Sequence, residues 1–212
     1  MSESYVDYFK SFAKILKESL EENCKMLCEL DASAGDGDHG TTILRGVSAA
    51  YTELMNIGDS TTISHCFKTI GYAMLKNMGG ASGPIFSTLF IQASIVTKGK
   101  DTLVGKDLLD IIESTEKGLY ELTLTKPGEK TMLDSIHGAL LELTANVKEG
   151  TTWEDSLEMA EIGAVKGMEA TKDMMATKGR AKYLGERSRG FVDAGAMSCS
   201  LIFKALNKAK KH

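Results

Sequence analysis

Apolar residues recur every three to four positions along most of the chain. The first stretch with this spacing begins at Tyr5 and ends at Leu27. The others lie at residues 43–54, 63–74, 85–93, 108–122, 133–147, 153–168 and 201–206. A repeat near 3.6 residues is typical of an amphipathic helix that buries one face. The pattern therefore predicts eight helices.

Signals for β-strands are almost missing from the same pattern. No segment alternates apolar and polar residues between two hairpin turns, and only FIQASIVT, at residues 90–97, is enriched in β-branched residues. No repeat of fixed length that would indicate a solenoid is found either. We therefore predict one all-α domain over residues 1–212, an antiparallel up-and-down array of eight helices.

Four connections between the predicted helices are rich in glycine and carry unusual residues. Counted from the first helix they are the first, third, fifth and seventh connections, at residues 31–40, 77–84, 126–132 and 178–195. In an up-and-down array, alternate connections lie at the same end. The four loops are therefore predicted to meet at one end of the array, although they are far apart in the sequence.

Composition and charge limit the classes of function. Hydrophobic residues make up 42% of the chain and charged residues 25%, and the formal net charge is −4. These values are typical of a globular protein without a broad basic surface for nucleic acid. No segment approaches the run of about eighteen apolar residues of a membrane helix, and the chain does not start with a secretory signal. We expect a cytoplasmic protein that binds neither nucleic acid nor membranes.

The cysteines give no sign of a metal or redox site. Cys24, Cys28, Cys66 and Cys199 are scattered, and no Cys-x-x-Cys pair is present. We expect buried structural thiols without a chemical role.

The loop DASAGDGDHG, at residues 31–40, combines three aspartates, one histidine and three glycines. Its G-x-G-x-x-G spacing resembles a dinucleotide-binding loop, but that motif follows a strand, whereas a helix is predicted here. Asp36 and Asp38 would also repel a pyrophosphate. An EF-hand loop starting at Asp36 would need oxygen ligands at Gly40 and Val47, and no P-loop pattern is present.

A magnesium site is the remaining ligand-binding interpretation of this loop. Mg²⁺ prefers oxygen ligands and is usually held by carboxylates together with substrate phosphates. Asp31, Asp36 and Asp38 with a nucleoside diphosphate bring roughly six negative charges, of which two Mg²⁺ ions offset four. The amides of residues 39–42, in the first turn of the next helix, would face the phosphates. The alternative is that these residues only cap the helix and form a turn, and His39 could equally be a cap or core residue.

The other three loops add further candidates. In GGASGP, the small residues Gly80, Ala81 and Ser82 would let a ligand approach the backbone closely, or would serve close helix packing. In KPGEKTM, Met132 could form a flexible apolar wall for a flat ring. In KGRAKYLGERSRG, most charges are typical of a solvated face, but Arg180 can bind phosphate through two hydrogen bonds.

The segments GDGDHG, GGASGP, KPGEKTM and KGRAKYLGERSRG, in this order, resemble the L subunit of dihydroxyacetone kinase, which also forms the C-terminal domain of single-chain dihydroxyacetone kinases. The resemblance covers residues 30–195. It implies an eight-helix antiparallel barrel that binds ADP or ATP at one end, through two Mg²⁺ ions held by Asp31, Asp36 and Asp38. It also implies a set of residues that contact the nucleotide: His39, Gly40, Thr41, Thr42, Gly80, Ala81, Ser82, Thr123, Met132, Arg180, Asp193, Ala194 and Gly195.

Two positions depart from the pattern of that family. The family often has Asp-Pro-Gly where this chain has Asp193, Ala194 and Gly195, and a relative has glycine where this chain has Thr123. We therefore expect a looser lid and a different edge of the pocket.

The resemblance also implies partner proteins. In that family a histidine of a separate K subunit holds the ketone covalently, so this chain would carry the phosphoryl group without a complete active site, and no catalytic residue is assigned to it. In the phosphotransferase-system branch an M subunit rephosphorylates bound ADP, whereas in the other branch ATP exchanges freely. We favour the first branch, with dihydroxyacetone as acceptor, because the domain stands alone at 212 residues.

Three alternatives remain open at this point. The chain could be an ATP-exchanging subunit that acts on another small ketose. It could be a nucleotide-sensing module that binds a transcription regulator, or a helical interaction protein whose loops are only turns. Whether it forms a homodimer is equally open.

Overall fold

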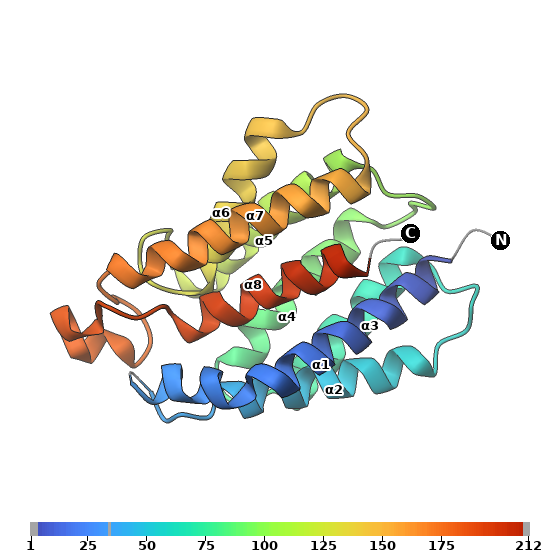
Figure 1. Ribbon diagram of the computed structural model, residues 1–212. Helices are drawn as coiled ribbons and strands as arrows, with labels where there is room; N and C mark the ends of the chain where they lie inside the picture. The colour runs from blue at the N-terminus through green and yellow to red at the C-terminus, as the bar shows by residue number, and fades with distance from the viewer. Residues whose placement is uncertain (1–3, 34, 210–212) are drawn as a thin grey trace.

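The computed structural model describes residues 4–33 and 35–209, and in these ranges all regular secondary structure is helical. The only strand-like feature of the described residues is one isolated bridge between Val104 and Thr152. The predicted all-α fold is therefore confirmed. The elements are α1 (Tyr5–Ala32), α2 (His39–Met55), α3 (Ile63–Asn77), α4 (Ser82–Val96), α5 (Gly105–Thr123), α6 (Met132–Asn146), α7 (Trp153–Ala170), the 3₁₀ segments η1 (Thr171–Asp173) and η2 (Ala181–Ser188), and α8 (Ala194–Lys208). The α-helices are labelled in Figure 1.

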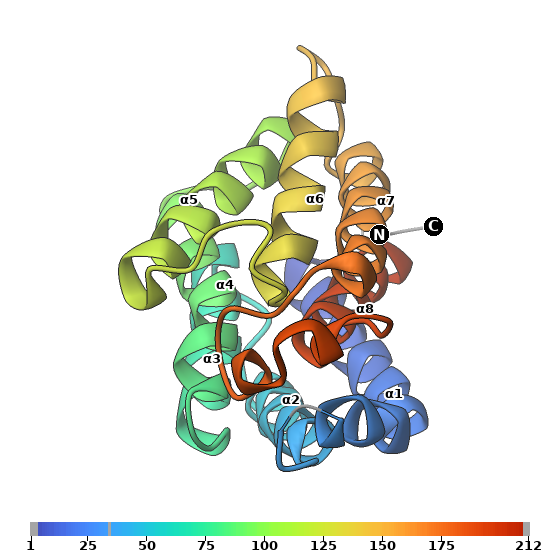
Figure 2. The same cartoon turned by 90° about the vertical axis from the view of Figure 1, so that its left-hand side faces the viewer.

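The eight α-helices form a closed antiparallel array. Each helix packs against the next one along the chain, and α8 packs against both α7 and α1, which closes the ring. Two further contacts, between α6 and α8 and between α5 and α7, make one side of the array more compact. Figure 1 shows the array from the side, and Figure 2 shows the end at which α1 ends and α2 begins.

The apolar stripes of the helices meet in a continuous core. Its largest side chains include Phe9, Phe12, Phe90 and Phe203, each with less than 2% of its surface exposed. The rings of Phe9 and Phe67 pack edge to face, with centroids 4.6 Å apart. Each side chain of this kind contributes about 1.5–3 kcal/mol when it is buried. The core therefore holds the helices rigidly, and with them the loops at their ends.

Some element boundaries differ from the prediction. The apolar pattern of the first helix ends at Leu27, but α1 extends to Ala32, so Asp31 lies in its last turn and not in a loop. Residues 178–195, expected to be a loop, contain the 3₁₀ segment η2 and the start of α8. Residues 1–3, 34 and 210–212 belong to the predicted domain but lie outside the described ranges. Residue 34 is also part of the first predicted loop.

The four glycine-rich loops meet at one end of the array, as the parity of the connections predicts (Figure 2). The segment between α7 and α8, residues 171–193, crosses this end and is here called the cap segment (Figure 2). The other three connections, at residues 56–62, 97–104 and 147–152, lie at the opposite end, where α1 begins and α8 ends (Figure 1). No helix of the described residues is long and apolar enough to span a membrane.

Candidate functional site

The first three glycine-rich loops and the cap segment, which contains most of the fourth, surround a cavity of about 780 Å³. Cavities that bind small molecules typically measure about 300–1,000 Å³. Most of the predicted site residues line it: Asp31, Asp36, Asp38, His39, Thr42, Gly80, Ala81, Ser82, Thr123, Met132, Arg180, Asp193, Ala194 and Gly195. Gly40 and Thr41, which are also described, are not among the residues that line the cavity.

Three aspartates form an acidic cluster at this cavity. Asp31 lies at the end of α1, Asp36 in the following loop, and Asp38 at the N-cap of α2. One carboxylate oxygen of each lies within 4.8 Å of the others. Two negative charges at such a distance repel each other by about 1 kcal/mol in water and about 4 kcal/mol near a protein surface. An arrangement of this kind favours a bound cation.

Local hydrogen bonds bring the three carboxylates together. Asp31 Oδ2 accepts hydrogen bonds from the backbone amides of Asp38, at 3.1 Å, and His39, at 3.4 Å. A Cβ atom on Gly35 would lie 2.5 Å from Asp31 Oδ1, so a larger residue at this position would push the carboxylate aside. Asp31 thus folds the loop back onto the end of α1.

Helix capping does not account for Asp38. It occupies the N-cap position of α2, but its side chain makes no capping hydrogen bond. The amides in the first turn of a helix have no acceptor within the helix, and together with the helix dipole they favour an anion. The carboxylate of Asp38 is therefore available to a ligand, whereas the amides of His39 and Thr42 already donate to the Asp31 carboxylate and the Asp38 carbonyl.

Arg180 lies against the acidic cluster. Its Nη1 atom is 2.5 Å from Asp36 Oδ2, and both side chains are about half exposed or more. The arginine that the sequence singled out as a phosphate ligand is thus at the same edge of the cavity as the three aspartates.

The ring of His39 is fixed by the protein. Only 8% of the residue is exposed, and Nε2 lies 2.8 Å from the Ser198 hydroxyl on α8. Burial lowers the pKa of the imidazole below its usual value, so the ring is neutral at pH 7. The His39 side chain is thus buried and bonded to α8, while the residue also lines the cavity, and its contact with phosphates stays a prediction.

Part of the cavity lining is apolar. It includes Ile85 and Phe86 on α4, Leu119 on α5, and Met132 and Leu133 at the start of α6. Such a wall suits a flat heterocycle, while the acidic edge suits a polar group with bound cations. The cavity therefore combines an acidic cluster with an apolar part of its lining.

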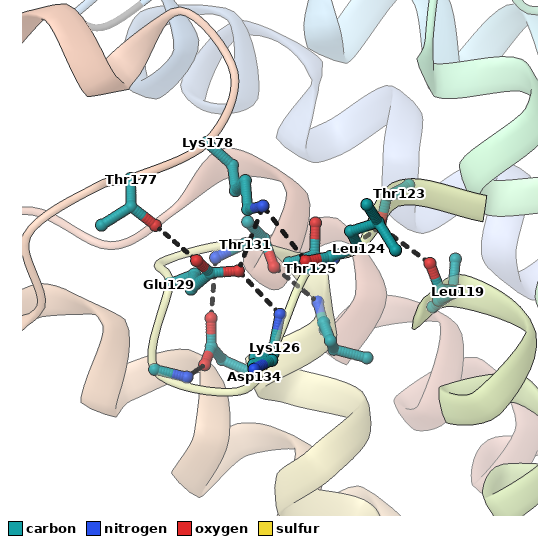
Figure 3. Close-up of polar contacts among 12 residues, drawn as sticks. Leu119, Thr123, Leu124, Thr125, Lys126, Glu129, Thr131, Asp134, Thr177 and Lys178 are labelled. Atoms are coloured by element: carbon teal, nitrogen blue, oxygen red, sulfur yellow. Dashed lines mark hydrogen bonds and ion pairs between the residues drawn. The ribbon is translucent and has the colours of Figure 1, made fainter. Parts of the chain in front are cut away.

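The two positions that depart from the family pattern have local roles. The Thr123 hydroxyl donates to the Leu119 carbonyl, at 2.7 Å, and accepts from the Thr125 amide, at 3.2 Å, so it fastens the end of α5 (Figure 3). Ala194 is the first residue of α8, a position where proline is well tolerated.

Asp193, the residue before Ala194, caps α8 and is partly buried. Its Oδ2 accepts a hydrogen bond of 2.8 Å from the Ala196 amide. Burial raises the pKa of its carboxyl group to about 6, although the amide bond and the nearby Lys130 amine oppose that change. The carboxylate of Asp193 is thus an acceptor for a hydrogen bond within the chain.

Three cationic residues of the cavity were missed by the sequence analysis: Arg45, Lys130 and Lys178. Arg45 donates from Nε to the Asn77 carbonyl, at 2.7 Å, and lies seven residues after Asp38, on the same face of α2. A helical wheel of α2 that includes Asp38 would have predicted that Arg45 faces the same side. Lys130 has only 2% of its surface exposed, and no pattern in the sequence predicts a buried lysine in a turn.

The cysteines agree with the structural role expected for them. Cys66 and Cys199 are buried, Cys24 and Cys28 are partly buried, and all four are free thiols. Burial raises the pKa of the Cys66 thiol to about 11 and that of Cys199 to about 12. At neutral pH these two are protonated and therefore weak nucleophiles.

Comparison with known proteins agrees with this geometry. The DAK2 domain family matches residues 33–208. The chain is 38% identical over 192 residues to the ADP-binding subunit DhaL of PEP-dependent dihydroxyacetone kinase 1 from Listeria innocua, covering 89% of each protein. It is 35% identical over 185 residues to the corresponding DhaL subunit from Escherichia coli, covering 87% of this chain and 88% of that protein.

Solved structures show the same fold. The dihydroxyacetone kinase of C. freundii in its native form matches with a TM-score of 0.70 and 24% identity, over 95% of this chain and 34% of that one. The same enzyme in complex with AMP-PNP and Mg²⁺ matches with a TM-score of 0.67 and 25% identity, over 95% and 33%. The chain thus spans about a third of that kinase. It belongs to the DAK2 domain family and, within it, to the L subunits of dihydroxyacetone kinase.

Proposed function

We propose that the chain binds an adenine nucleotide with Mg²⁺ in the cavity and transfers its terminal phosphoryl group to dihydroxyacetone held on a separate K subunit. ADP stays bound and is rephosphorylated by an M subunit of the phosphotransferase system. The observation that carries this proposal is the position of three carboxylates within 4.8 Å of one another beside a cavity with an apolar wall. The names of the relatives, PEP-dependent kinases with an ADP-binding subunit, support it.

The residues of the acidic cluster fit magnesium. Asp31, Asp36 and Asp38 offer only oxygen ligands, which Mg²⁺ prefers, and three carboxylates are enough to share two ions with the phosphates. When bound, Mg²⁺ would neutralise the charge of the phosphates and of the transferring group.

The chain's own residues would position the nucleotide. The N-terminal end of α2 would attract the phosphates through the helix dipole, and Arg180 is close enough to the acidic cluster to reach them. The base would pack on the apolar wall that contains Phe86 and Met132. In phosphoryl transfer, positioning and charge neutralisation supply most of the catalysis. The chain therefore needs no nucleophile of its own for the transfer.

The test removes one metal ligand. In the Asp36→Asn variant we expect the loss of bound nucleotide, seen by mass analysis of the freshly purified protein. We also expect the loss of dihydroxyacetone phosphorylation when K and M subunits and phosphoenolpyruvate are added. The matched control is Asp59→Asn, because Asp59 is an exposed residue in the loop between α2 and α3, at the opposite end of the array.

Three outcomes would contradict the proposal in whole or in part. Nucleotide content that is the same in Asp36→Asn and in the wild type would exclude the acidic cluster as the metal site. Tight ADP binding without any turnover in the presence of both partner subunits would instead favour a regulatory module. Nucleotide that leaves the wild-type protein on simple dialysis would favour the ATP-exchanging form of the kinase.

A further inference from the structure

The cap segment supplies one wall of the cavity, and two adjacent residues fasten it. Lys178, Gly179, Arg180 and residues 191–193 of this segment line the cavity. The residues that fasten it are Glu129 and Lys130, in the loop between α5 and α6. Their side chains contact different parts of the cap segment, Glu129 its middle and Lys130 its two ends.

Lys130 joins the beginning and the end of the cap segment. Its amine donates hydrogen bonds to the carbonyl of Thr171, at the start of the segment, and to that of Phe191, near its end. The amine also lies 4.9 Å from the centroid of the Phe191 ring, a cation–π contact. Two residues after Phe191 comes Asp193, which caps α8. The lysine therefore fixes the part of the wall that leads into α8.

Glu129 holds the middle of the cap segment (Figure 3). Its Oε1 accepts a hydrogen bond of 3.0 Å from the Thr177 hydroxyl, and its Oε2 lies 3.6 Å from the Lys178 amine. Oε2 also accepts a bond of 2.7 Å from the Lys126 amide, which fixes the carboxylate in its own loop. Lys178 in turn donates to the Leu124 carbonyl, at 3.1 Å. The segment is thus bonded two residues before Arg180.

The conformation of Lys130 is unfavourable in isolation. Its φ angle of 59° is in the left-handed region, which residues other than glycine rarely adopt. Its amine is almost fully buried, and burial lowers its pKa below the usual value, although the nearby Asp193, Asp134 and Asp173 oppose this. A backbone conformation that costs free energy persists only where the surrounding structure holds it in place. Such conformations are concentrated at functional sites.

We propose that Glu129 and Lys130 are positioning residues that set how long a nucleotide stays in the cavity, because they fasten the cap segment across it. This inference rests on the proposed function. A nucleotide that leaves past Arg180 has to displace the cap segment, and each bond to Glu129 or Lys130 resists that displacement. The two residues act through Arg180 and Asp193, which line the cavity.

The test compares two double variants. Glu129→Ala with Lys130→Met removes the fastening side chains, whereas Lys148→Met with Glu149→Gln changes an exposed pair of the same types in the loop between α6 and α7, at the opposite end. Dissociation of a fluorescent ADP analogue is followed by stopped flow after mixing with excess ADP and Mg²⁺. We expect dissociation to be faster by on the order of tenfold in the first variant, since hydrogen bonds to charged groups contribute about this factor or more.

A second readout examines the cap segment without nucleotide. Hydrogen exchange of the peptide amides in residues 171–193 should be faster in the first variant, while that of α3 should stay unchanged. If Lys130→Met prevents folding, Glu129→Ala alone is compared with Glu149→Ala. A merely structural effect would accelerate exchange throughout the protein and lower the affinity for nucleotide without selectively raising the dissociation rate.

The outcomes separate this inference from the proposed function. Unchanged exchange in residues 171–193, or faster exchange with an unchanged dissociation rate, would overturn the inference and leave the proposed function intact. Failure of the wild-type protein to bind the analogue at all would overturn the proposed function, and the inference with it.

Discussion

The guanidinium of Arg180 and the carboxylate of Asp36 form an ion pair, with Nη1 and Oδ2 2.5 Å apart. The same carboxylate belongs to the acidic cluster that favours a cation. Asp36 is therefore shared between the cap segment and the expected metal site. This relation links the position of the cap segment to metal binding.

Removal of Arg180 should strengthen the binding of a divalent cation alone. In Arg180→Ala no side chain competes for Asp36, and the cluster becomes more negative. Exposed ion pairs contribute about 0.2–1 kcal/mol, so we expect the affinity for Mn²⁺, measured by electron paramagnetic resonance without nucleotide, to rise a few-fold. Arg187→Ala, at an exposed arginine of η2, is the control. Weaker Mn²⁺ binding in Arg180→Ala would contradict this view of the pair.

Gly40 should be essential for the packing of α2 on α1. A Cβ atom at this position would lie 2.2 Å from the Cys24 carbonyl oxygen, and a backbone atom cannot move aside as a side chain can. We expect Gly40→Ala to lower the free energy of unfolding by about 1–3 kcal/mol, as overpacking does elsewhere. Gly58→Ala is the matched control, since nothing lies within 4 Å of its added Cβ. Equal urea denaturation curves for the two variants would show that α1 and α2 accommodate the added methyl group without a loss of stability.

Asp193 should make the stability of the protein depend on pH. Burial raises the pKa of its carboxyl group from an ordinary value near 3.8 to about 6. Between these values the folded chain keeps a proton that the unfolded chain has lost, so the free energy of unfolding falls as the pH rises through this window and is level above it. The full effect is about 3 kcal/mol.

The variant Asp193→Asn isolates this effect. Asparagine can still accept the hydrogen bond from the Ala196 amide, but it does not titrate. Urea denaturation between about pH 4 and pH 7 should therefore show a decline in the wild type that is smaller in the variant by up to about 3 kcal/mol. Parallel pH profiles of the two proteins would contradict the assignment of this decline to Asp193.

The Thr123 hydroxyl should matter more for stability than for nucleotide binding. Because it already bonds to Leu119 and Thr125, its removal in Thr123→Val should cost about 1 kcal/mol of unfolding free energy and change ADP affinity little. Thr52→Val, which loses only an exposed bond within α2, is the control. A large loss of ADP affinity in calorimetry, with stability unchanged, would show that this hydroxyl binds the nucleotide instead.

The helical fold could be predicted from the sequence because each helix buries one apolar face. The prediction was wrong at the end of α1, where Glu29, Leu30, Asp31 and Ala32 show no apolar repeat although the backbone continues as a helix. Hydrogen bonds from the loop amides to Asp31 help to hold that last turn, and such bonds leave no trace in a hydrophobic pattern.

Part of the geometry of the site could be predicted, because the parity of the connections brings the glycine-rich loops to one end, where the three aspartates lie together. That these aspartates hold a cation stays a prediction. The arrangement of the cap segment could not be predicted. Lys130 and Glu129 look like ordinary solvated charges in a Pro-Gly turn, and only the left-handed backbone at Lys130 sends the lysine inward to Thr171 and Phe191. Tertiary bonds to distant carbonyl groups decide its burial, and the sequence does not reveal them.

The most direct test of the central claim is a calorimetric titration with ADP, once with Mg²⁺ and once with EDTA, of the wild-type protein from which bound nucleotide has been removed. If Asp31, Asp36 and Asp38 hold the phosphates through a cation, ADP binds with Mg²⁺, and its affinity in EDTA falls by at least about a hundredfold, since the charges then repel at close range. Equal affinity in the two titrations would contradict the account, because the nucleotide would then be bound without the acidic cluster.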